Sequence, residues 1–309
     1  MERSWEEELL IADLRQTAHR DGQKDPYVVE LGDDAAVYPT PWAHGVACAD
    51  QLVEGVHFDL AYLSLSDVGF KAVTVNLSDL AAMGAQPDRI LCTIAAPKTV
   101  AVAELIDGVR QACRRFDVEL VGGDLSRGSE IVVSVSAIGH LGDHELPLRR
   151  DRGRPGDAIA VTRALGAAAA GLRSLRANGS HHYPRLPHEE QHARPLPRIE
   201  EGRAALIGGA SGAMDISDGF ALDLHRLADL SDVGFVIDHV PVDPAATEEE
   251  ALFGGEDYEL IITTPHPNQL ERTFRERGLP PPLVIGRIVA DRAVRTHASL
   301  PLPRRGYLH

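Results

Sequence analysis

The stretch KAVTVNLSDLAAMGAQP, residues 71–87, carries Val, Leu, Ala or Met at most positions and then breaks at a glycine. With the residues before it, this pattern predicts a long and mostly buried helix over 66–84 that ends at Gly84. Asp79 lies inside that helix. A buried carboxylate is costly unless it is paired or bound to a metal ion. The stretch therefore predicts a long, mostly buried helix whose carboxylate needs either an ion partner or a metal ion.

Strands and helices alternate on both sides of this helix. In the N-terminal half, strands are expected at 45–53, 89–96, 118–121 and 131–139, and helices at 4–20, 66–84 and 101–116. In the C-terminal half, strands are expected at 157–162, 212–216, 234–238, 257–264 and 283–289, and helices at 164–177, 198–208, 219–230 and 267–277. A basic stretch rich in Gly and Pro, 144–157, separates the halves. The pattern predicts an α/β (α+β) protein with two domains, 1–145 and 146–309.

Charge and composition exclude several classes of protein. The net charge of −15 argues against nonspecific binding to nucleic acid or to an anionic membrane surface. No run of 18 apolar residues occurs, and the acidic N-terminus is not a secretory signal. The three cysteines form no CxxC pair, which is typical of reduced thiols. We expect a cytoplasmic protein with neither a nucleic acid nor a membrane as partner.

Six segments place Asp or Glu beside Gly or Ser. They are 31–38, 49–60, 75–85, 121–128, 214–224 and 252–260. Taken one at a time, each segment can be explained as a helix cap or a turn. Together they indicate hard divalent cations, Mg²⁺ by preference, bound with phosphates. The chain has neither the GxxxxGK[ST] nor the GxGxxG pattern, so a P-loop or Rossmann nucleotide site is not supported.

The motifs GDDAA, DQLVEGVHF, KAVTVNLSDLAAMGAQP, GGD, DISDGFALDL and GGEDYEL occur in this order. With them the sequence resembles the thiamine-monophosphate kinases, which belong to the aminoimidazole ribonucleotide synthetase-like ATP-binding superfamily. The resemblance implies a two-domain fold in a homodimer whose N-terminal sheets pair. It also implies phosphorylation of thiamine monophosphate to thiamine diphosphate, with ATP as co-substrate and several Mg²⁺ ions as cofactors.

The resemblance also implies roles for single residues. The metal ligands are expected to be Asp34, Asp50, Asp79, Asp124, Asp215 and Asp218. ATP is expected to contact Gly123, Asp124, Arg150 and Ser217. The substrate is expected to contact His57, Glu256 and Arg304. The acceptor is a phosphate oxygen that is already ionised near neutral pH. No catalytic general base is therefore expected, and metal-assisted positioning with direct in-line transfer suffices.

Four positions depart from the pattern of these kinases. Cys48 and Ala49 stand where hydroxyl side chains usually help to bind Mg²⁺, Leu125 replaces a Thr, and Arg304 replaces an aromatic residue. A thiol is a poor Mg²⁺ ligand. Two alternatives therefore stay open, another ATP-dependent enzyme of the superfamily or a nucleotide-binding homologue with reduced or lost turnover.

A zinc-peptidase pattern is also present. The string HEEQH, 188–192, fits HExxH, which needs a helix that presents both imidazoles on one face. Pro187 and Pro195 limit any helix to about two turns, and the flanking residues are polar. We expect 178–194 to be an exposed loop of the second domain rather than a peptidase site.

Overall fold

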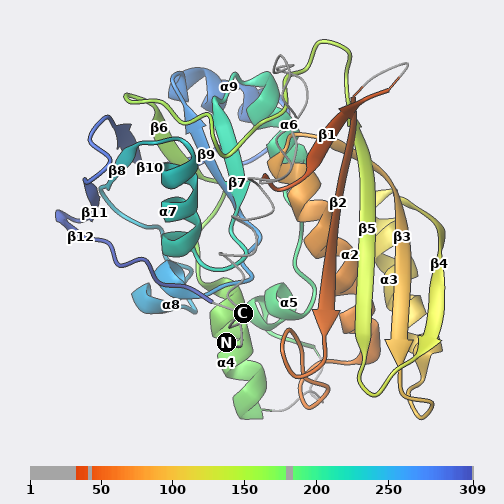
Figure 1. The fold of residues 1–309 in the computed structure, drawn as a ribbon. Coiled ribbons are helices and arrows are strands. Elements are labelled where there is room, and N and C mark those ends of the chain that lie inside the picture. The colour runs from red at the N-terminus through yellow and green to blue at the C-terminus, as the bar shows by residue number, and fades with distance from the viewer. Residues whose placement is uncertain (1–32, 41–43, 179–183, 308–309) are drawn as a thin grey trace, which may run out of the picture.

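The computed structural model describes residues 33–40, 44–178 and 184–307, which form two β-sheets with helices packed against them (Figure 1). The first sheet has the strand order β1-β2-β5-β3-β4. These strands are β1 (Ala36–Pro39), β2 (His44–Val53), β3 (Gln86–Ala96), β4 (Glu119–Arg127) and β5 (Val132–Leu141). Only β3 and β4 pair in parallel, and α3 (Val102–Phe116) connects them.

The second sheet is formed by the C-terminal half and has the order β12-β11-β8-β10-β6-β9-β7. Its strands are β6 (Ala158–Val161), β7 (Gly212–Asp215), β8 (Gly234–Ile237), β9 (Leu260–Thr264), β10 (Leu283–Val289), β11 (Arg295–His297) and β12 (Leu300–Pro301). All of its strand pairs are antiparallel except β8 with β11. The mixed α/β architecture expected from the sequence is confirmed.

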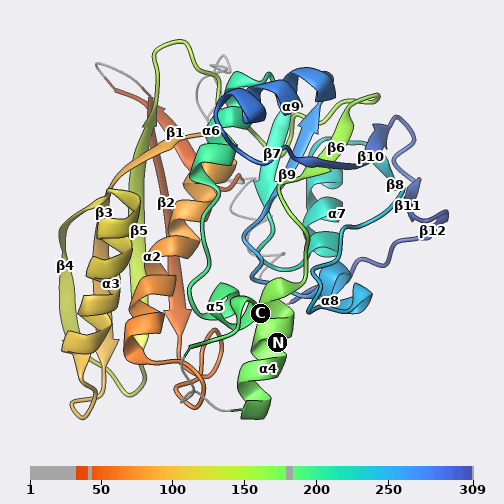
Figure 2. The same cartoon turned by 180° about the vertical axis from the view of Figure 1, so that it is seen from behind.

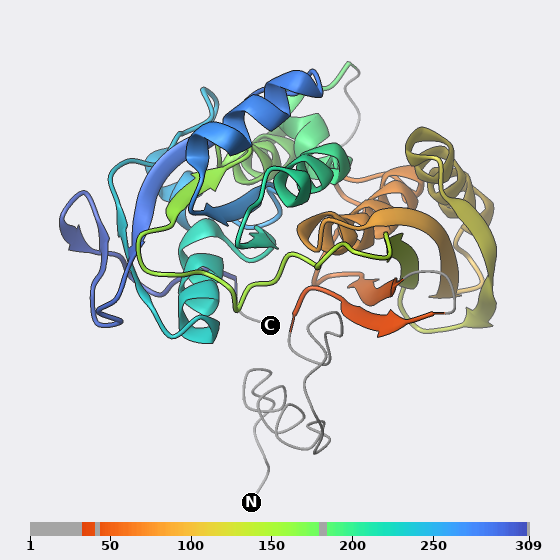
Figure 3. The same cartoon turned by 90° about the horizontal axis from the view of Figure 1, so that it is seen from above.

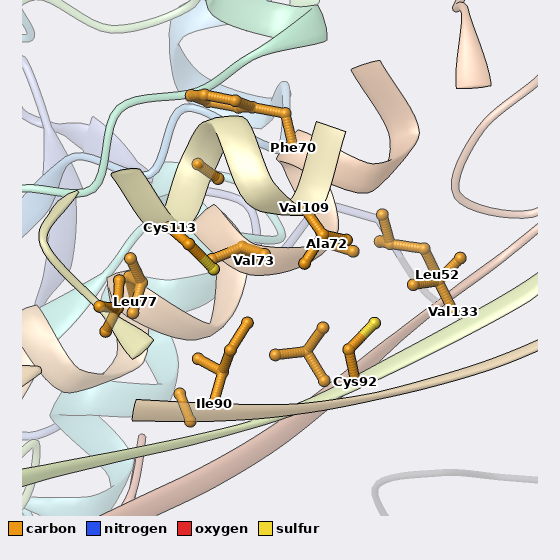
Figure 4. Packing of buried hydrophobic residues seen from close by; sticks show 14 of the residues in the cluster. Leu52, Phe70, Ala72, Val73, Leu77, Ile90, Cys92, Val109, Cys113 and Val133 are labelled. Carbon is orange, nitrogen blue, oxygen red and sulfur yellow. The ribbon is translucent and has the colours of Figure 1, made fainter. Parts of the chain in front are cut away.

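Helix α2 (Leu65–Ala82) packs with α3 on one face of the first sheet, as Figure 2 shows from behind. In Figure 4, Val73 of α2 and Cys113 of α3 lie beside each other above Ile90 of β3, and all three belong to one buried core. The two helices touch closely, because a Cβ on Gly108 would lie 2.0 Å from the carbonyl oxygen of Ser66. The long, mostly buried helix predicted from the sequence is therefore present.

The ends of α2 have identifiable causes. Ser64 and Asp67 form a capping box at the N-terminus, in which each side chain accepts from the backbone N–H of the other residue. Gly84 follows the C-terminus with φ of +69°, a conformation that favours glycine. Both ends are fixed, so the side chains of α2 have defined positions.

No helix of the described ranges covers the opposite face of the first sheet (Figure 1, and from above in Figure 3). The helices of the C-terminal half are α4 (Ala167–Asn178), α5 (Pro187–Ala193), α6 (Ile199–Ile207), α7 (Phe220–Leu230), α8 (Glu248–Phe253) and α9 (Pro267–Glu276). Helix α6 packs against α2 and so joins the two halves. Within the described residues, no helix combines the length and the apolarity that crossing a bilayer would take.

Most of the elements expected from the sequence are present within a few residues, and the differences are local. The loop expected over 178–194 is wrong from 187 onward, because α5 forms there and buries Glu189 and His192. Strand β4 is longer than expected, and β1, α8, β11 and β12 were not expected. The helix expected at 4–20 lies outside the described residues.

Candidate metal centre and adjoining cavity

Three carboxylates from distant parts of the chain meet where α2 approaches the second sheet. Asp34 precedes β1, Asp79 lies in the last turn of α2, and Asp215 ends β7. One oxygen atom of each lies within 4.8 Å of the others. Ser78 helps to fix this group, because its hydroxyl donates to Asp215 Oδ2 at 2.6 Å. We call Asp34, Asp79 and Asp215 the acidic cluster.

The acidic cluster concentrates negative charge in a buried place. Burial, together with the neighbouring carboxylates, raises the pKa of Asp79 and of Asp215 well above the ordinary range. Burial and the charge of Asp34 raise the pKa of Asp33 to about 7. The Arg150 guanidinium forms an ion pair with Asp34 and lies 3.4 Å from Asp33 Oδ1. Arg150 therefore offsets part of the charge that these side chains share.

The donor atoms of the acidic cluster fit a hard divalent cation. They are all carboxylate oxygens, which Mg²⁺ and Ca²⁺ prefer to nitrogen or sulfur. Because burial and the neighbouring carboxylates raise the pKa of Asp79 and of Asp215, a bound cation would favour their ionised forms. No other group of three or more potential ligands with this spacing occurs in the part of the chain that the structure describes.

Asp50 lies next to the acidic cluster and not inside it. It is exposed on β2, and its charge contributes to the raised pKa of Asp79. Asn76 of α2 holds this part of β2, because its Oδ1 accepts from the backbone N–H of Asp50 at 2.8 Å. The Cys48 thiol donates to the carbonyl oxygen of Asn76 at 3.3 Å, and burial raises its pKa well above the ordinary value. Cys48 is thus a neutral thiol that packs against α2, which makes it unsuited to bind Mg²⁺.

A cavity of about 590 Å³ opens beside the acidic cluster, between β2 and α2 on one side and the C-terminal half on the other. Asp50, Ser217 and Asp218 line it near the acidic cluster. His57 and Glu256 also line it, so the cavity brings together predicted metal, nucleotide and substrate residues. Side chains that were not predicted complete its wall, among them Val56, Tyr62, Arg176, His192, Tyr258 and Arg305.

The DISDG loop is held by an aspartate from the following helix. Asp223 Oδ2 accepts from the backbone N–H groups of Ser217, Asp218 and Gly219 at 3.0–3.1 Å. Arg226 lies 3.0 Å from Asp223 Oδ1 and also forms an ion pair with Asp218. Asp223 therefore serves the structure of the loop, whereas Asp218 faces the cavity.

Glu256 lies in a strained segment at the wall of the cavity. Its φ is +67°, and that of Tyr258 is +50°, both in the left-handed region that non-glycine residues rarely adopt. Such strain of about 1–3 kcal/mol per residue is found mainly at functional sites. Lys71 Nζ lies 2.6 Å from Glu256 Oε1 and lowers the pKa of Glu256, although burial opposes this effect. Lys71 of α2 is thus the buried counter-ion of Glu256.

Asp257, the residue after Glu256, holds the start of a helix and does not face the cavity. Asp257 accepts from the backbone N–H groups of Gly166 and Ala168 at 2.6 and 3.1 Å, at the start of α4. Burial raises its pKa to about 7. Within one short motif, the first acidic side chain therefore faces the cavity and the second fixes a helix.

Gly123 and Asp124, which were predicted to contact ATP, lie away from the acidic cluster of their own chain. Asp124 is on β4, in one row with Thr93, Ser134 and Gln51 on the uncovered face of the first sheet. Asp50 belongs to the next row, whose side chains point to the helical face. Three strand spacings of about 4.8 Å also separate β4 from β2. Asp124 and Asp50 of one chain therefore cannot bind the same ion.

Gly123 precedes Asp124 and has a structural reason to be glycine. Its φ is +153°, and a Cβ there would lie 1.7 Å from the carbonyl oxygen of Cys92 on the neighbouring strand. The close approach of β3 and β4 therefore requires glycine at this position, whatever it contacts in addition.

Arg304 does not line the cavity in this structure. Its guanidinium forms an ion pair with Asp229 of α7. The neighbouring Arg305 lines the cavity instead, with its guanidinium 4.8 Å from the centre of the Phe253 ring. Arg305, and not Arg304, is therefore placed where it can contact a substrate in the cavity.

The HEEQH string does not form a zinc site. Glu189 is buried and engaged, because it accepts from the Ser174 hydroxyl and from the backbone N–H of Leu186. His188 is half-buried and does not line the cavity, whereas His192 is buried and lines it. Sequence reasoning missed His192 because the two flanking prolines and the polar neighbours indicated an exposed loop.

The chain is similar to known proteins over both of its halves. Family models described as AIR synthase related protein, N-terminal domain and C-terminal domain, match residues 32–141 and 154–298. The chain is 36% identical over 253 residues to the thiamine-monophosphate kinase of Bacillus subtilis (strain 168), covering 76% of this chain and 77% of that protein. It is 34% identical over 283 residues to the thiamine-monophosphate kinase of Methanospirillum hungatei JF-1, covering 90% and 92%.

A solved structure described as "AaThiL complexed with AMPPCP and TMP" superposes with a TM-score of 0.84 at 29% identity. The superposition covers 98% of this chain and 97% of that one. Both halves of the chain and their relative arrangement are therefore shared with that protein.

Proposed function

The chain belongs to the AIR synthase related protein family and, within it, to the thiamine-monophosphate kinases, and from this premise we propose that it transfers a phosphoryl group from ATP to thiamine monophosphate. The products are thiamine diphosphate and ADP. One observation carries the proposal. A single cavity is lined by Asp50 and Asp218 near the acidic cluster and by the recessed carboxylate of Glu256. The end near Asp50 and Asp218 is the one we assign to the phosphates, and the end near Glu256 is the one we assign to the organic part of the acceptor.

The reaction must first bring two anions together. At an effective dielectric constant of about 20, two unit charges about 4 Å apart repel each other by about 4 kcal/mol. The acidic cluster, Asp50 and Asp218 would hold Mg²⁺, which would supply positive charge to neutralise the phosphates. Arg150 and Arg226 hold Asp34 and Asp218 in place and add cationic charge close to these carboxylates. Arg150 and Ser217 are our candidates for contacts to ATP.

The chain's own residues act by positioning. His57 is oriented at the cavity wall, because its Nδ1 accepts from the backbone N–H of Val53 at 3.0 Å. Glu256 is held by Lys71. No general base is needed, so we propose direct in-line transfer without a phosphoenzyme. With a chiral γ-phosphoryl group, the transferred phosphorus is expected to invert its configuration, and retention would contradict the proposal.

We further propose that the active form is a homodimer in which the uncovered faces of the first sheets pair. Asp124 and Gly123 lie on this sheet, away from the acidic cluster of their own chain. Pairing of the sheets offers a way for Asp124 to reach a nucleotide held by a second copy. Sedimentation velocity is expected to give twice the chain mass, and a monomer with full activity would refute the pairing.

We propose residues 1–145 as the part that binds metal and dimerises, supported by the first sheet, and 146–309 as the part that completes the cavity. The three cysteines are free, which supports a reducing compartment such as the cytoplasm.

Product analysis tests the function. Purified protein is incubated with ATP, Mg²⁺ and thiamine monophosphate, and thiamine diphosphate is quantified. Asp218→Asn is expected to abolish the product, because it removes a charge at the cavity, and Asp238→Asn is the matched control at an exposed carboxylate. Absence of product from the unaltered protein would refute the proposal and favour a homologue that binds the nucleotide without turnover.

A further inference from the structure

Three arginines line the cavity alongside its three carboxylates. The carboxylates are those assigned above to metal ions or to the acceptor. The arginines take no part in the metal and nucleotide contacts proposed above. They are Arg173 and Arg176 of α4 and Arg305 of the C-terminal segment, and we call them the arginine rim.

The arginine rim lies where the cavity opens to solvent. The side chains of Arg173 and Arg305 are 58% and 60% exposed, whereas that of Glu256 is 25% exposed. Arg176 is exposed as well, and its guanidinium lies 5.8 Å from the centre of the Tyr62 ring, which also lines the cavity. A ligand that enters from solvent therefore meets guanidinium groups before it meets the recessed carboxylate.

Two arginines of the rim are paired with the same short helix. Arg173 Nε lies 2.7 Å from Glu250 Oε1, and Arg305 Nη2 lies 2.8 Å from Glu249 Oε1. Both glutamates belong to α8, and neither of them lines the cavity. The cationic partner of each pair is therefore the one on the side of the cavity.

Arg176 is the member of the rim without such a partner. Within the described residues it forms no ion pair with a carboxylate. Its charge acts on the interior of the cavity, because it adds to the effects of burial and of Lys71, which lower the pKa of His192 to about 3. The rim thus leaves positive charge on the side of the cavity that solvent reaches.

Positive charge at this opening favours the approach of an anion. The chain has a net charge of −15, and carboxylates line the interior of the cavity, so a phosphorylated acceptor is repelled by the protein as a whole. Charges at the opening of a cleft act on an approaching ion within about one Debye length, about 8 Å at physiological salt. Such charges change association rates by about 10-fold or more.

We propose that the arginine rim determines specificity for the charge of the acceptor. It attracts thiamine monophosphate, whose phosphate outweighs the single cation of its thiazolium ring, and it repels unphosphorylated thiamine, which carries the cation alone. This inference rests on the proposed function, because it concerns how the acceptor of that reaction is selected. The two molecules share their organic part, so the shape of the recessed end of the cavity cannot distinguish them.

Charge changes of opposite sign test the inference. In the triple variant every arginine of the rim is changed to Gln, which removes its positive charge. Glu249→Gln/Glu250→Gln breaks two of the same ion pairs but leaves the rim more positive. Arg176→Lys keeps the charge on a side chain of different shape. Exposed ion pairs contribute little to stability, so all of these variants are expected to fold, and circular dichroism and the melting temperature check this.

A matched control comes from an arginine outside the cavity. Arg287 is also 58% exposed, and its Nη1 lies 3.8 Å from Asp238 Oδ1 on the second sheet, so Arg287→Gln removes a similar charge elsewhere. Dissociation constants of thiamine monophosphate and of thiamine are measured by isothermal titration calorimetry, with Mg²⁺ and without nucleotide. The titrations are carried out at about 0.05 M and about 0.5 M salt, where the Debye length falls from about 14 Å to about 4 Å.

The preference for thiamine monophosphate over thiamine is the readout. At low salt we expect the triple variant to bind thiamine monophosphate about 10-fold more weakly and thiamine no more weakly than the unaltered protein. Glu249→Gln/Glu250→Gln is expected to raise the preference, and Arg176→Lys and Arg287→Gln are expected to keep it. At high salt the triple variant should bind thiamine monophosphate within about 3-fold of the unaltered protein.

A structural role of the arginines predicts other results. Equal weakening of both ligands in the triple variant would overturn the inference, as would a loss that persists at high salt. A lowered preference in Glu249→Gln/Glu250→Gln would overturn it too, because that change leaves the rim more positive. Failure of the unaltered protein to bind thiamine monophosphate would have the same consequence. Thiamine diphosphate formation, measured separately, decides the proposed function, so binding without turnover would refute only that function.

Discussion

Replacing Lys71 by Met is expected to destabilise the protein through an unpaired charge. The side chain of Lys71 is 0% exposed and that of Glu256 is 25% exposed, and their charged atoms are 2.6 Å apart. Removing one partner of a buried ion pair typically costs about 3–5 kcal/mol, because the other charge remains without compensation. Since Glu256 retains some contact with the cavity, we expect a loss near the lower limit, about 3 kcal/mol.

The second variant separates the charge from the packing. Met has a length similar to Lys, so the loss in Lys71→Met reflects the charge more than the volume. In Lys71→Met/Glu256→Gln the uncompensated charge is gone, and we expect a total loss of about 1 kcal/mol, about 2 kcal/mol less than in Lys71→Met alone. The exposed Lys98→Met is the matched control and is expected to change stability by less than about 0.5 kcal/mol.

The measurement is the free energy of unfolding in urea for all four proteins, without metal or nucleotide. A Lys71→Met protein within about 1 kcal/mol of the unaltered one would refute the reasoning, because a buried carboxylate without its partner cannot be so well tolerated. The reasoning would also fail if the double variant were no more stable than Lys71→Met.

Three further predictions concern other parts of the chain. Hydrogen bonds from Arg185 and neighbouring groups lower the pKa of Asp67 to about 2, although burial opposes this shift. The ionised Asp67 therefore adds about 2 kcal/mol to the free energy of unfolding above pH 4, and this contribution is lost as the pH falls from 4 to 2. The stability difference between the protein and Asp67→Asn should therefore shrink on acidification, and unfolding at several pH values checks this. Mg²⁺ should raise the melting temperature of the unaltered protein and not that of Asp215→Asn, and an equal rise in both would contradict the proposed ligand. Gly108→Ala should lower the melting temperature by several degrees at a cost of about 1–3 kcal/mol, while Gly142→Ala, with room for a Cβ, should not.

The sequence predicts the elements with strong periodicity and misses those whose burial depends on charge. Helix α2 is recognisable because its apolar residues recur over many turns. Helix α5 is not recognisable from the sequence. Arg185 and Arg194 hold its segment in place by pairing with Asp67, which is more than 100 residues away in the sequence. No local pattern in 184–194 contains that information.

The same distinction applies to the candidate site. The predicted ligands Asp34, Asp79 and Asp215 do meet, and motif recognition was sufficient to select them. The edge-strand location of Asp124 depends on strand order, which the motif does not contain. His192 was hidden because its neighbours are polar, and its burial follows only from the way α5 packs against α4.

Helix α2 carries both the partner of Glu256 and a member of the acidic cluster. Lys71, which holds Glu256, and Asp79 of the acidic cluster lie on the same face of α2, eight residues apart, and Val75 between them lines the cavity. At a rise of about 1.5 Å per residue they are about 12 Å apart along the axis. Because a buried helix does not stretch, we expect it to fix the distance between these two groups and hence the length of an acceptor that reaches both. Side-chain replacements can alter which ring is accepted, but an acceptor of different length would need a different backbone.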